Sequence, residues 1–188
     1  LKECIDAGAD GFRFDGAKHI ETPIDGANFA SDFWPTVVGG AETYAQQTYS
    51  KDLYVYGEVL DTTTGVSLSG YTQYMAITDN SWGNSLRKSI EADQAALAAG
   101  YNKAADPSVL VLWAESHDTY GNDNGTSIDV SEANINKTWA LVAARKDTMA
   151  LYLARPESLT DTLLGEADVT GWELLWNEKY AGKILMFD

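Results

Sequence analysis

Three carboxyl groups lie directly after predicted β-strands, where parallel α/β proteins gather their reactive groups. Asp15 ends the first such strand, Glu58 follows the second, and Asp118 follows a later one within the run Glu115–Asp118. The chain carries 28 Asp and Glu residues, so any single one of these carboxylates is better explained as a loop or helix-cap residue. Three carboxylates at the same topological level instead predict one site.

Two facing carboxyl groups can hydrolyse a glycosidic bond, because one protonates the leaving oxygen while the other attacks the sugar carbon or activates water. Arg13 lies two residues before Asp15, so both side chains point to the same face of the strand. A guanidinium at this place would keep Asp15 ionised, as a nucleophile requires. Glu58 follows the more apolar residues 55–57, which would raise its pKa and suit a general acid.

Aromatic residues supply a second feature that fits a sugar ligand. The chain holds 6 Trp, 10 Tyr and 5 Phe, most of which are expected in the core. Trp113 and Tyr120 flank the third carboxylate, and aromatic faces stack on sugar rings. Both are therefore candidate substrate-binding residues.

The elements that position these groups follow from the hydrophobic pattern along the chain. Strands are predicted over residues 10–15, 53–59, 74–78, 109–114 and 149–154, and helices over residues 1–7, 32–49, 82–99 and 131–145. Strands that alternate with helices indicate βα units and a mostly parallel sheet. The predicted fold class is α/β.

Glycine and proline predict where the helices break or end. Gly8 should end the first helix, and Gly100 should end the helix that starts near Trp82. The helix after Asp32 is expected to be interrupted by Pro35 and Gly39–Gly40.

Two strands and one late segment carry further expectations. The apolar runs over residues 109–114 and 149–154 are both typical of strands that are buried on two faces. A last amphipathic segment carries Trp172, Leu175 and Trp176 at helical spacing.

Composition excludes several classes of function. The formal net charge of −15 argues against binding nucleic acid, which needs clustered Lys and Arg. No apolar run approaches the roughly 20 residues that span a bilayer, so we expect no membrane segment. Cys4 is the only cysteine, so no intramolecular disulfide can form, and we expect a buried structural thiol.

Three segments of the chain resemble successive signature segments of one enzyme family. They are Gly11–His19 (GFRFDGAKH), Gly57–Leu60 (GEVL) and Trp113–Tyr120 (WAESHDTY). In this order and spacing they resemble the α-amylase family, glycoside hydrolase family 13, and bacterial secreted α-amylases in particular. The likeness covers nearly the whole chain and fades after about residue 155. It implies a partial (β/α)8 TIM barrel that comprises about strands 4–8 with their helices.

The resemblance also implies a role for each matching residue. Asp15 matches the nucleophile that forms the covalent glycosyl intermediate, and Glu58 matches the general acid/base. Asp118 matches the third carboxylate, which grips sugar hydroxyls and favours the distorted ring. His117 matches the histidine that helps to hold the same sugar, and Arg13 matches the arginine beside the nucleophile.

Two residues after the nucleophile match positions on the leaving-group side of the bond. These are Lys18 and His19, although a solvated surface lysine is an alternative for Lys18. The His19 carbonyl matches a ligand of the family's structural calcium ion, so Ca²⁺ is the expected metal.

The sequence departs from the family pattern in two ways. Gly16 stands where the family more often has Ala, which should mainly loosen the turn. The family's first signature segment, an Asp near an Asn-His pair at the end of strand three, does not occur in the chain. That segment would supply another sugar-binding histidine and a calcium-ligating asparagine.

The length favours a fragment of a larger enzyme. A complete barrel of this kind takes about 250 residues, whereas this chain has 188 and begins in a predicted helix. We therefore expect residues 1–188 to form the C-terminal part of a catalytic barrel, with 160–188 at its end and at the approach to a following domain. Such a fragment is expected to be inactive alone. The resemblance further implies an extracellular enzyme that is monomeric at full length.

The activity that the resemblance implies is retaining endo-hydrolysis of α-1,4-glucosidic bonds in starch, glycogen and related α-glucans. One alternative is a family member that acts on α-1,6 or trehalose-type linkages, or a transglycosylase. Residues 115–120 favour the endo-acting starch hydrolases by resemblance. The second alternative, an inactive glucan-binding homologue, predicts a lost acid or nucleophile, and all three carboxylates are present. No feature of the sequence favours a structural or interaction protein.

Overall fold

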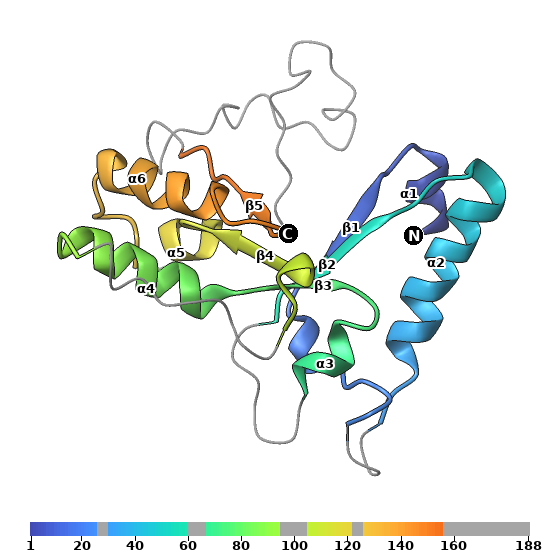
Figure 1. The fold of residues 1–188 in the computed structure, drawn as a ribbon. Helices are drawn as coiled ribbons and strands as arrows, with labels where there is room; N and C mark the ends of the chain where they lie inside the picture. Colours follow the sequence, from blue (N-terminus) through green and yellow to red (C-terminus); the bar gives the residue numbers. More distant parts are fainter. Residues whose placement is uncertain (26–29, 60–66, 95–104, 122–125, 156–188) are drawn as a thin grey trace, which may run out of the picture.

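The computed structural model describes residues 1–25, 30–59, 67–94, 105–121 and 126–155 (Figure 1). Its strands are β1 (Gly11–Phe14), β2 (Tyr54–Gly57), β3 (Ala76–Thr78), β4 (Leu110–Trp113) and β5 (Met149–Leu151). Its α-helices are α1 (Lys2–Asp6), α2 (Phe33–Tyr49), α3 (Leu68–Tyr71), α4 (Asn80–Glu91), α5 (His117–Gly121) and α6 (Glu132–Ala143). Two short 3₁₀ helices are η1 (Ala17–His19) and η3 (Pro107–Val109).

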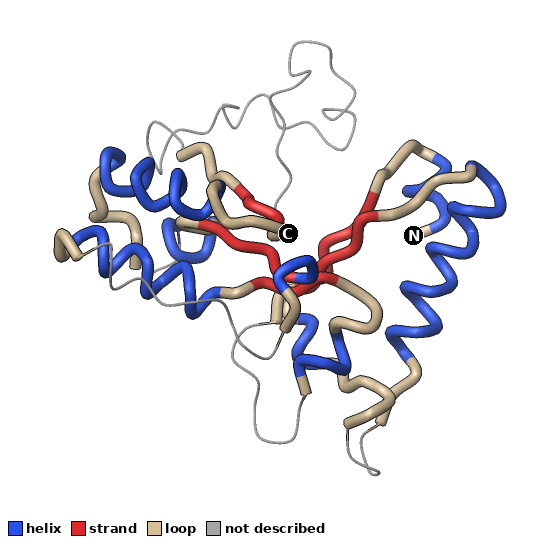
Figure 2. Tube along the Cα trace, in the orientation of Figure 1, coloured by secondary structure: helices blue, strands red, loops and turns tan. Residues whose placement is uncertain are grey.

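The five described strands form one parallel sheet in chain order, β1-β2-β3-β4-β5. Each strand pairs with the strand that follows it, and a helical connection returns the chain to the same edge of the sheet. The sheet curls, and the longer helices α2, α4 and α6 flank it (Figure 2). The predicted α/β fold class is confirmed, because this arrangement is a partial (β/α)8 barrel.

Helix α2 is unbroken from Phe33 to Tyr49, so the predicted interruption at Pro35 and Gly39–Gly40 is wrong. Pro35 occupies the first turn of the helix, where a backbone amide has no hydrogen-bond acceptor within the helix, so the lack of an amide hydrogen costs nothing. The helix buries one apolar face, which offsets the cost of the two glycines. The buried side chains on that face are Trp34, Val38, Ala41 and Ala45.

Helix α4 begins at Asn80 and ends at Glu91, earlier than the predicted end near Gly100. The Asp79 side chain caps its first turn by accepting a hydrogen bond from the Trp82 amide at 3.0 Å. Asp93 has a φ of +55°, a left-handed conformation that Asp tolerates and that stops the helix. Residues 95–104, where the predicted end falls, lie outside the described residues.

The burial of β5 differs from the prediction, whereas β4 is buried throughout as expected. Met149 of β5 is 43% exposed, because this strand forms an edge of the described sheet and has a neighbour on one side. The amphipathic segment at Trp172–Trp176 and the predicted barrel end at residues 160–188 lie outside the described residues.

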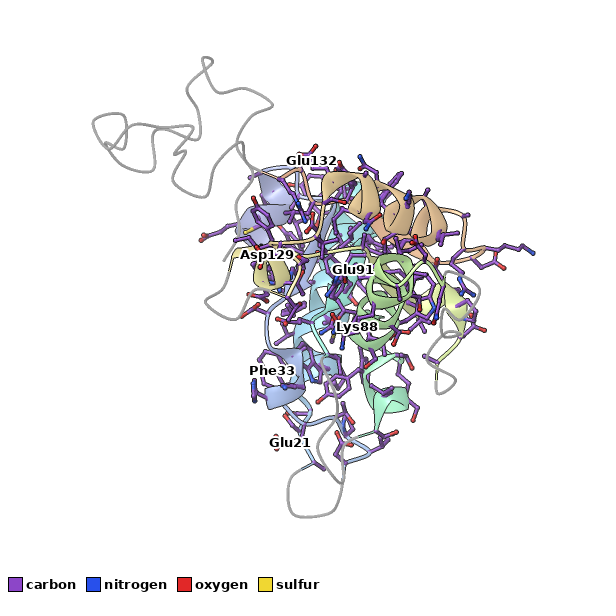
Figure 3. All side chains as sticks on the ribbon, turned by 90° about the vertical axis from the view of Figure 1, so that its left-hand side faces the viewer. Glu21, Phe33, Lys88, Glu91, Asp129 and Glu132 are labelled. Carbon is purple, nitrogen blue, oxygen red and sulfur yellow. The ribbon has the colours of Figure 1, made fainter. Side chains whose placement is uncertain are left out.

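The main core lies between the sheet and its helices, with Trp34, Tyr71, Trp82 and Leu112 among its buried side chains. Charged side chains such as Lys88, Glu91 and Glu132 point outward from α4 and α6 (Figure 3).

The expectation of a buried cysteine thiol is wrong. Cys4 is exposed, because α1 turns Ile5 rather than Cys4 toward the core. In the part of the chain that the structure describes, no helix is both long and apolar enough to cross a bilayer.

Candidate active site

The first two predicted site carboxylates lie next to each other at the carboxyl edge of the sheet. Strand β1 pairs with β2 in a register that sets Phe14 opposite Gly57. The next residues along these strands are Asp15 and Glu58, and the Glu58 amide donates to the Phe14 carbonyl at 2.8 Å. The parallel register therefore places the two carboxyl groups side by side.

Arg13 connects both carboxylates through one guanidinium group. Its Nη1 lies 2.8 Å from Asp15 Oδ1, and its Nη2 lies 3.1 Å from Glu58 Oε2. The Gly16 amide donates to the same Glu58 oxygen at 3.3 Å. Asp15 and Glu58 therefore share one face of the sheet, as paired action on one bond requires.

The two carboxyl groups differ in exposure and in pKa. Asp15 is 59% exposed, and its hydrogen bond with Arg13 is the main reason that its pKa lies below its ordinary value. Glu58 is only 13% exposed, and burial is the main reason that its pKa is raised. A hydrogen bond between the two side chains moves both pKa values further in these directions. Asp15 therefore ionises at lower pH than Glu58, and the acid and nucleophile roles of the two groups stay predictions.

His117 and Asp118 open helix α5, which follows β4 at the same edge of the sheet. His117 Nε2 lies 3.6 Å from Asp118 Oδ1, and both side chains are partly exposed. A positive charge on His117 contributes to the lowered pKa of Asp15, after the larger effect of the Arg13 hydrogen bond. The structure therefore brings His117 toward the Asp15–Glu58 pair.

Lys18 and His19 lie in η1, directly after the nucleophile candidate. Gly16 starts this turn with a φ of +47°, a left-handed conformation that glycine adopts without strain. The His19 amide donates to the Gly16 carbonyl at 2.9 Å, which closes the turn. Lys18 is partly buried and His19 is exposed.

The calcium ion expected at the His19 carbonyl stays a prediction. Calcium takes about six to eight oxygen ligands, and among the described residues no three His, Cys, Asp or Glu side chains are grouped to hold a metal ion. No step of the reaction proposed below uses a metal.

The two aromatic candidates are already engaged with the protein. Trp113 lies in β4 and is 7% exposed, and its backbone carbonyl packs against Gly83 of α4. Tyr120 lies in α5, with the Arg155 guanidinium 4.9 Å from its ring centroid. Their predicted contact with sugar stays a prediction.

Sequence reasoning missed the partner of Glu115, the first acid after β4. Glu115 is buried and forms a two-pronged ion pair with Arg155, beyond the end of β5. Local residue spacing cannot predict a contact between side chains 40 positions apart. The available indication was that Arg155, like Glu115, follows a predicted strand, which places both residues at the carboxyl edge of the sheet.

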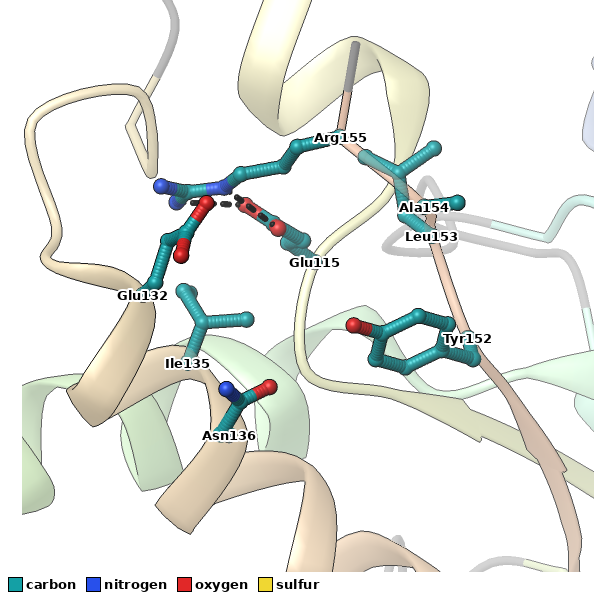
Figure 4. A pocket seen from close by; sticks show the side chains of 8 residues that line it. All are labelled: Glu115, Glu132, Ile135, Asn136, Tyr152, Leu153, Ala154 and Arg155. Carbon is teal, nitrogen blue, oxygen red and sulfur yellow. Dashed lines mark hydrogen bonds and ion pairs between the residues drawn. The ribbon is translucent and has the colours of Figure 1, made fainter. Parts of the chain in front are cut away.

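A cavity of about 200 Å³ lies between α6 and the residues after β5 (Figure 4). Its lining residues are Glu115, Glu132, Ile135, Asn136, Tyr152, Leu153, Ala154 and Arg155. Neither Asp15 nor Glu58 lines it, so this cavity is separate from the paired carboxylates.

A curled parallel sheet with paired carboxyl groups at its carboxyl edge is typical of barrel-fold glycoside hydrolases. Sequence comparison points to one family within that class. The chain is 32% identical over 176 residues to a protein named alpha-amylase from Clostridium acetobutylicum, which covers 90% of this chain and 22% of that protein. It is 34% identical over 198 aligned residues to an alpha-amylase from Butyrivibrio fibrisolvens, which covers 89% of this chain and 20% of that protein.

These matches confirm the resemblance to the α-amylase family. The chain spans about a fifth of the length of the curated relatives that it matches. No family model matches the chain.

Proposed function

We propose that the protein hydrolyses α-1,4-glucosidic bonds within starch, glycogen and related α-glucans, with retention of configuration at the anomeric carbon. The observation that carries this proposal is the Arg13 guanidinium, which joins Asp15 and Glu58 on one face of the sheet. The pKa of Asp15 is lowered and that of Glu58 is raised, so one carboxyl is ready to attack and the other to donate a proton.

The first step forms a covalent intermediate. Glu58 donates its proton to the glycosidic oxygen while a carboxylate oxygen of Asp15 attacks the anomeric carbon. The bond from that carbon to the glycosidic oxygen breaks, and the leaving sugar departs with a new hydroxyl group. Arg13 keeps Asp15 ionised for this attack, because its guanidinium stabilises the carboxylate.

The second step releases the remaining sugar. Glu58, now ionised, takes a proton from water, whose oxygen attacks the same anomeric carbon. The ester bond to Asp15 breaks, and both carboxyl groups return to their starting states. Two successive inversions give net retention, which requires carboxyl groups about 5–5.5 Å apart.

The other predicted site residues complete this proposal. Asp118 and His117 hold the sugar whose bond is cleaved, and Lys18 and His19 contact the leaving side. Trp113 and Tyr120 belong to the same predicted sugar site. A structural Ca²⁺ bound by the His19 carbonyl would need further ligands beyond this one. We also propose that the enzyme acts outside the cell, as a monomer.

Product analysis on the full-length gene product tests the activity. Soluble starch and maltoheptaose should be cleaved internally, and NMR of the first products should show the α-anomer. Asp15→Asn and Glu58→Gln should abolish most of the activity, whereas Asp10→Asn, a change to an exposed carboxylate at the amino edge, should not. Initial release of the β-anomer would contradict the retaining mechanism. Preferential cleavage of isomaltose or trehalose, or transfer to another sugar, would favour the alternative family activities. Binding of glucan without cleavage would favour an inactive homologue.

A further inference from the structure

Arg155 and Glu115 form a buried ion pair at the carboxyl edge of β4 and β5. Arg155 Nε lies 2.8 Å from Glu115 Oε1, and Arg155 Nη2 lies 2.9 Å from Glu115 Oε2 (Figure 4). The Glu115 side chain is 1% exposed and that of Arg155 is 13% exposed. Such a planar, two-pronged contact fixes the orientation of both groups as well as their distance.

The same guanidinium holds the backbone that follows β4. Arg155 Nη2 donates to the Ser127 carbonyl at 2.7 Å, and Nη1 donates to the Val130 carbonyl at 2.8 Å. Its positive charge also lies over the Tyr120 ring. Arg155 therefore contacts both described parts, residues 115–121 and 126–130, of the connection between β4 and α6, here called the β4–α6 segment.

His117 and Asp118 lie within this segment, and the contacts of Arg155 reach their neighbours. Ser127, whose carbonyl Arg155 binds, donates from its amide to the Thr119 carbonyl at 2.8 Å. The Ser116 amide in turn donates to the Thr119 hydroxyl at 2.9 Å. Movement of the guanidinium would thus be passed to the residues on either side of His117 and Asp118.

A buried pair of this kind is better suited to orientation than to stability. The cost of removing two charges from water offsets much of their attraction, so apolar residues of similar size often stabilise a protein as well. An apolar pair would not, however, bind two carbonyl groups at set distances. Lysine would keep the charge but lose the planar fork.

We propose that Arg155 is a positioning residue, which holds the β4–α6 segment so that His117 and Asp118 face the sugar bound at Asp15. This inference rests on the proposed glucan hydrolysis for its functional consequence. Arg155 acts through Glu115, Ser127 and Val130 and does not itself touch the reacting atoms.

Arg155→Met in the full-length gene product provides the test, with Lys51→Met as a matched control. Lys51 is also bonded to one carboxylate, Asp10, and to two carbonyls, but at the amino edge of the sheet. Arg155→Met should lower kcat on maltoheptaose by about 100-fold, the effect of an error of about 1 Å in placement. KM should change much less, and the basic limb of the pH–rate profile should stay in place, because His117 does not contribute to the raised pKa of Glu58. Lys51→Met should keep kcat within about twofold.

The kinetic results can refute the proposal, and a second variant keeps it testable if the first does not fold. A folded Arg155→Met variant with kcat within about twofold of wild type would refute it, and so would an equal loss in Lys51→Met. If Arg155→Met does not fold, Arg155→Lys replaces it and should lose about 10-fold in kcat, because the fork is gone while the charge remains. Unchanged kcat in that variant would also refute positioning.

Hydrogen exchange separates this proposal from the proposed function. If the wild-type protein cleaves no glucan, the proposed function fails, but the amides of residues 116–121 still report on the β4–α6 segment. These amides should exchange at least about 10-fold faster in the Arg155 variant than in wild type or Lys51→Met. Equal exchange in all three proteins would refute the positioning role.

Discussion

Arg13 serves two carboxyl groups that need opposite protonation states. Its hydrogen bond lowers the pKa of the exposed Asp15, whereas burial keeps the pKa of Glu58 raised although the arginine charge opposes that shift. The difference arises because Glu58 is mostly removed from water and Asp15 is not. One cation can therefore support an ionised carboxylate and a protonated carboxyl group at the same time.

The pH dependence of activity should follow from these two pKa values. Activity requires ionised Asp15 and protonated Glu58, so it should rise as the pH passes the lowered pKa of Asp15 and fall as it passes the raised pKa of Glu58. Arg13→Gln removes an interaction that lowers both values, so both limbs of the profile of kcat/KM should move to higher pH. Arg145→Gln is the control, because Arg145 follows α6 and its guanidinium lies over the Trp82 ring of α4. An unmoved acidic limb in Arg13→Gln would contradict the role of Arg13.

The separate roles of the carboxyl groups should appear when the leaving group is changed. Glu58→Gln should lower kcat on maltoheptaose by about 10²–10⁴-fold, because no proton reaches the leaving oxygen. On maltosyl fluoride, whose fluoride leaves without protonation, this variant should still form the intermediate. Asp15→Asn should be inactive on both substrates, because the nucleophile is lost. Equal losses of both variants on both substrates would argue against the assignment.

At the scale of elements, the strands and most helices were predictable, whereas the continuity of α2 and the end of α4 were not. The short apolar runs of β1, β2 and β4 locate the sheet, and their last residues locate Asp15 and Glu58 at one edge. The continuity of helix α2 was not predicted, because tertiary burial of Trp34 and Val38 outweighs the local cost of glycine. The ion pair of Arg155 with Glu115 was also not predicted, because it depends on β5 lying beside β4 and on no local sequence pattern.

Two helical glycines should respond in opposite ways to alanine. Gly40 of α2 is exposed, and an added Cβ would meet no atom within 4 Å, so Gly40→Ala should raise the free energy of unfolding by about 0.5–1 kcal/mol. Gly83 of α4 is buried, and its Cβ would lie 2.6 Å from the Trp113 carbonyl oxygen. Gly83→Ala should therefore cost about 1–3 kcal/mol. Urea unfolding followed by circular dichroism measures both, and equal effects would contradict the close contact of α4 with β4.

At the scale of the whole molecule, the curled parallel sheet collects residues that lie far apart in the sequence. Arg13 meets Glu58 across 45 positions, and Glu115 meets Arg155 across 40. Parallel pairing in chain order brings every strand end to the same edge, so common placement of the carboxylates was predictable once the strands were found. Which acid faces the site and which is buried in an ion pair depends on packing that the sequence pattern does not specify.

The net charge of −15 should make stability depend on salt. Raising the NaCl concentration from about 10 to 150 mM shortens the screening length from about 30 to about 8 Å. Repulsion among the acids should weaken, so the Tm should rise. Replacing the exposed acids Glu3 and Glu42 by Gln should reduce this response. A Tm that falls with salt would mean that attractive ion pairs outweigh the repulsion.

The exposed thiol of Cys4 has a practical consequence for experiments on this molecule. It is the only cysteine among the 188 residues, and α1 places it before β1, at the edge opposite the carboxylates. A maleimide dye or a surface tether attached there would sit away from the strand ends that carry Asp15 and Glu58. These 188 residues thus offer one thiol for immobilisation or fluorescence at a distance from the two carboxylates that we propose to be catalytic.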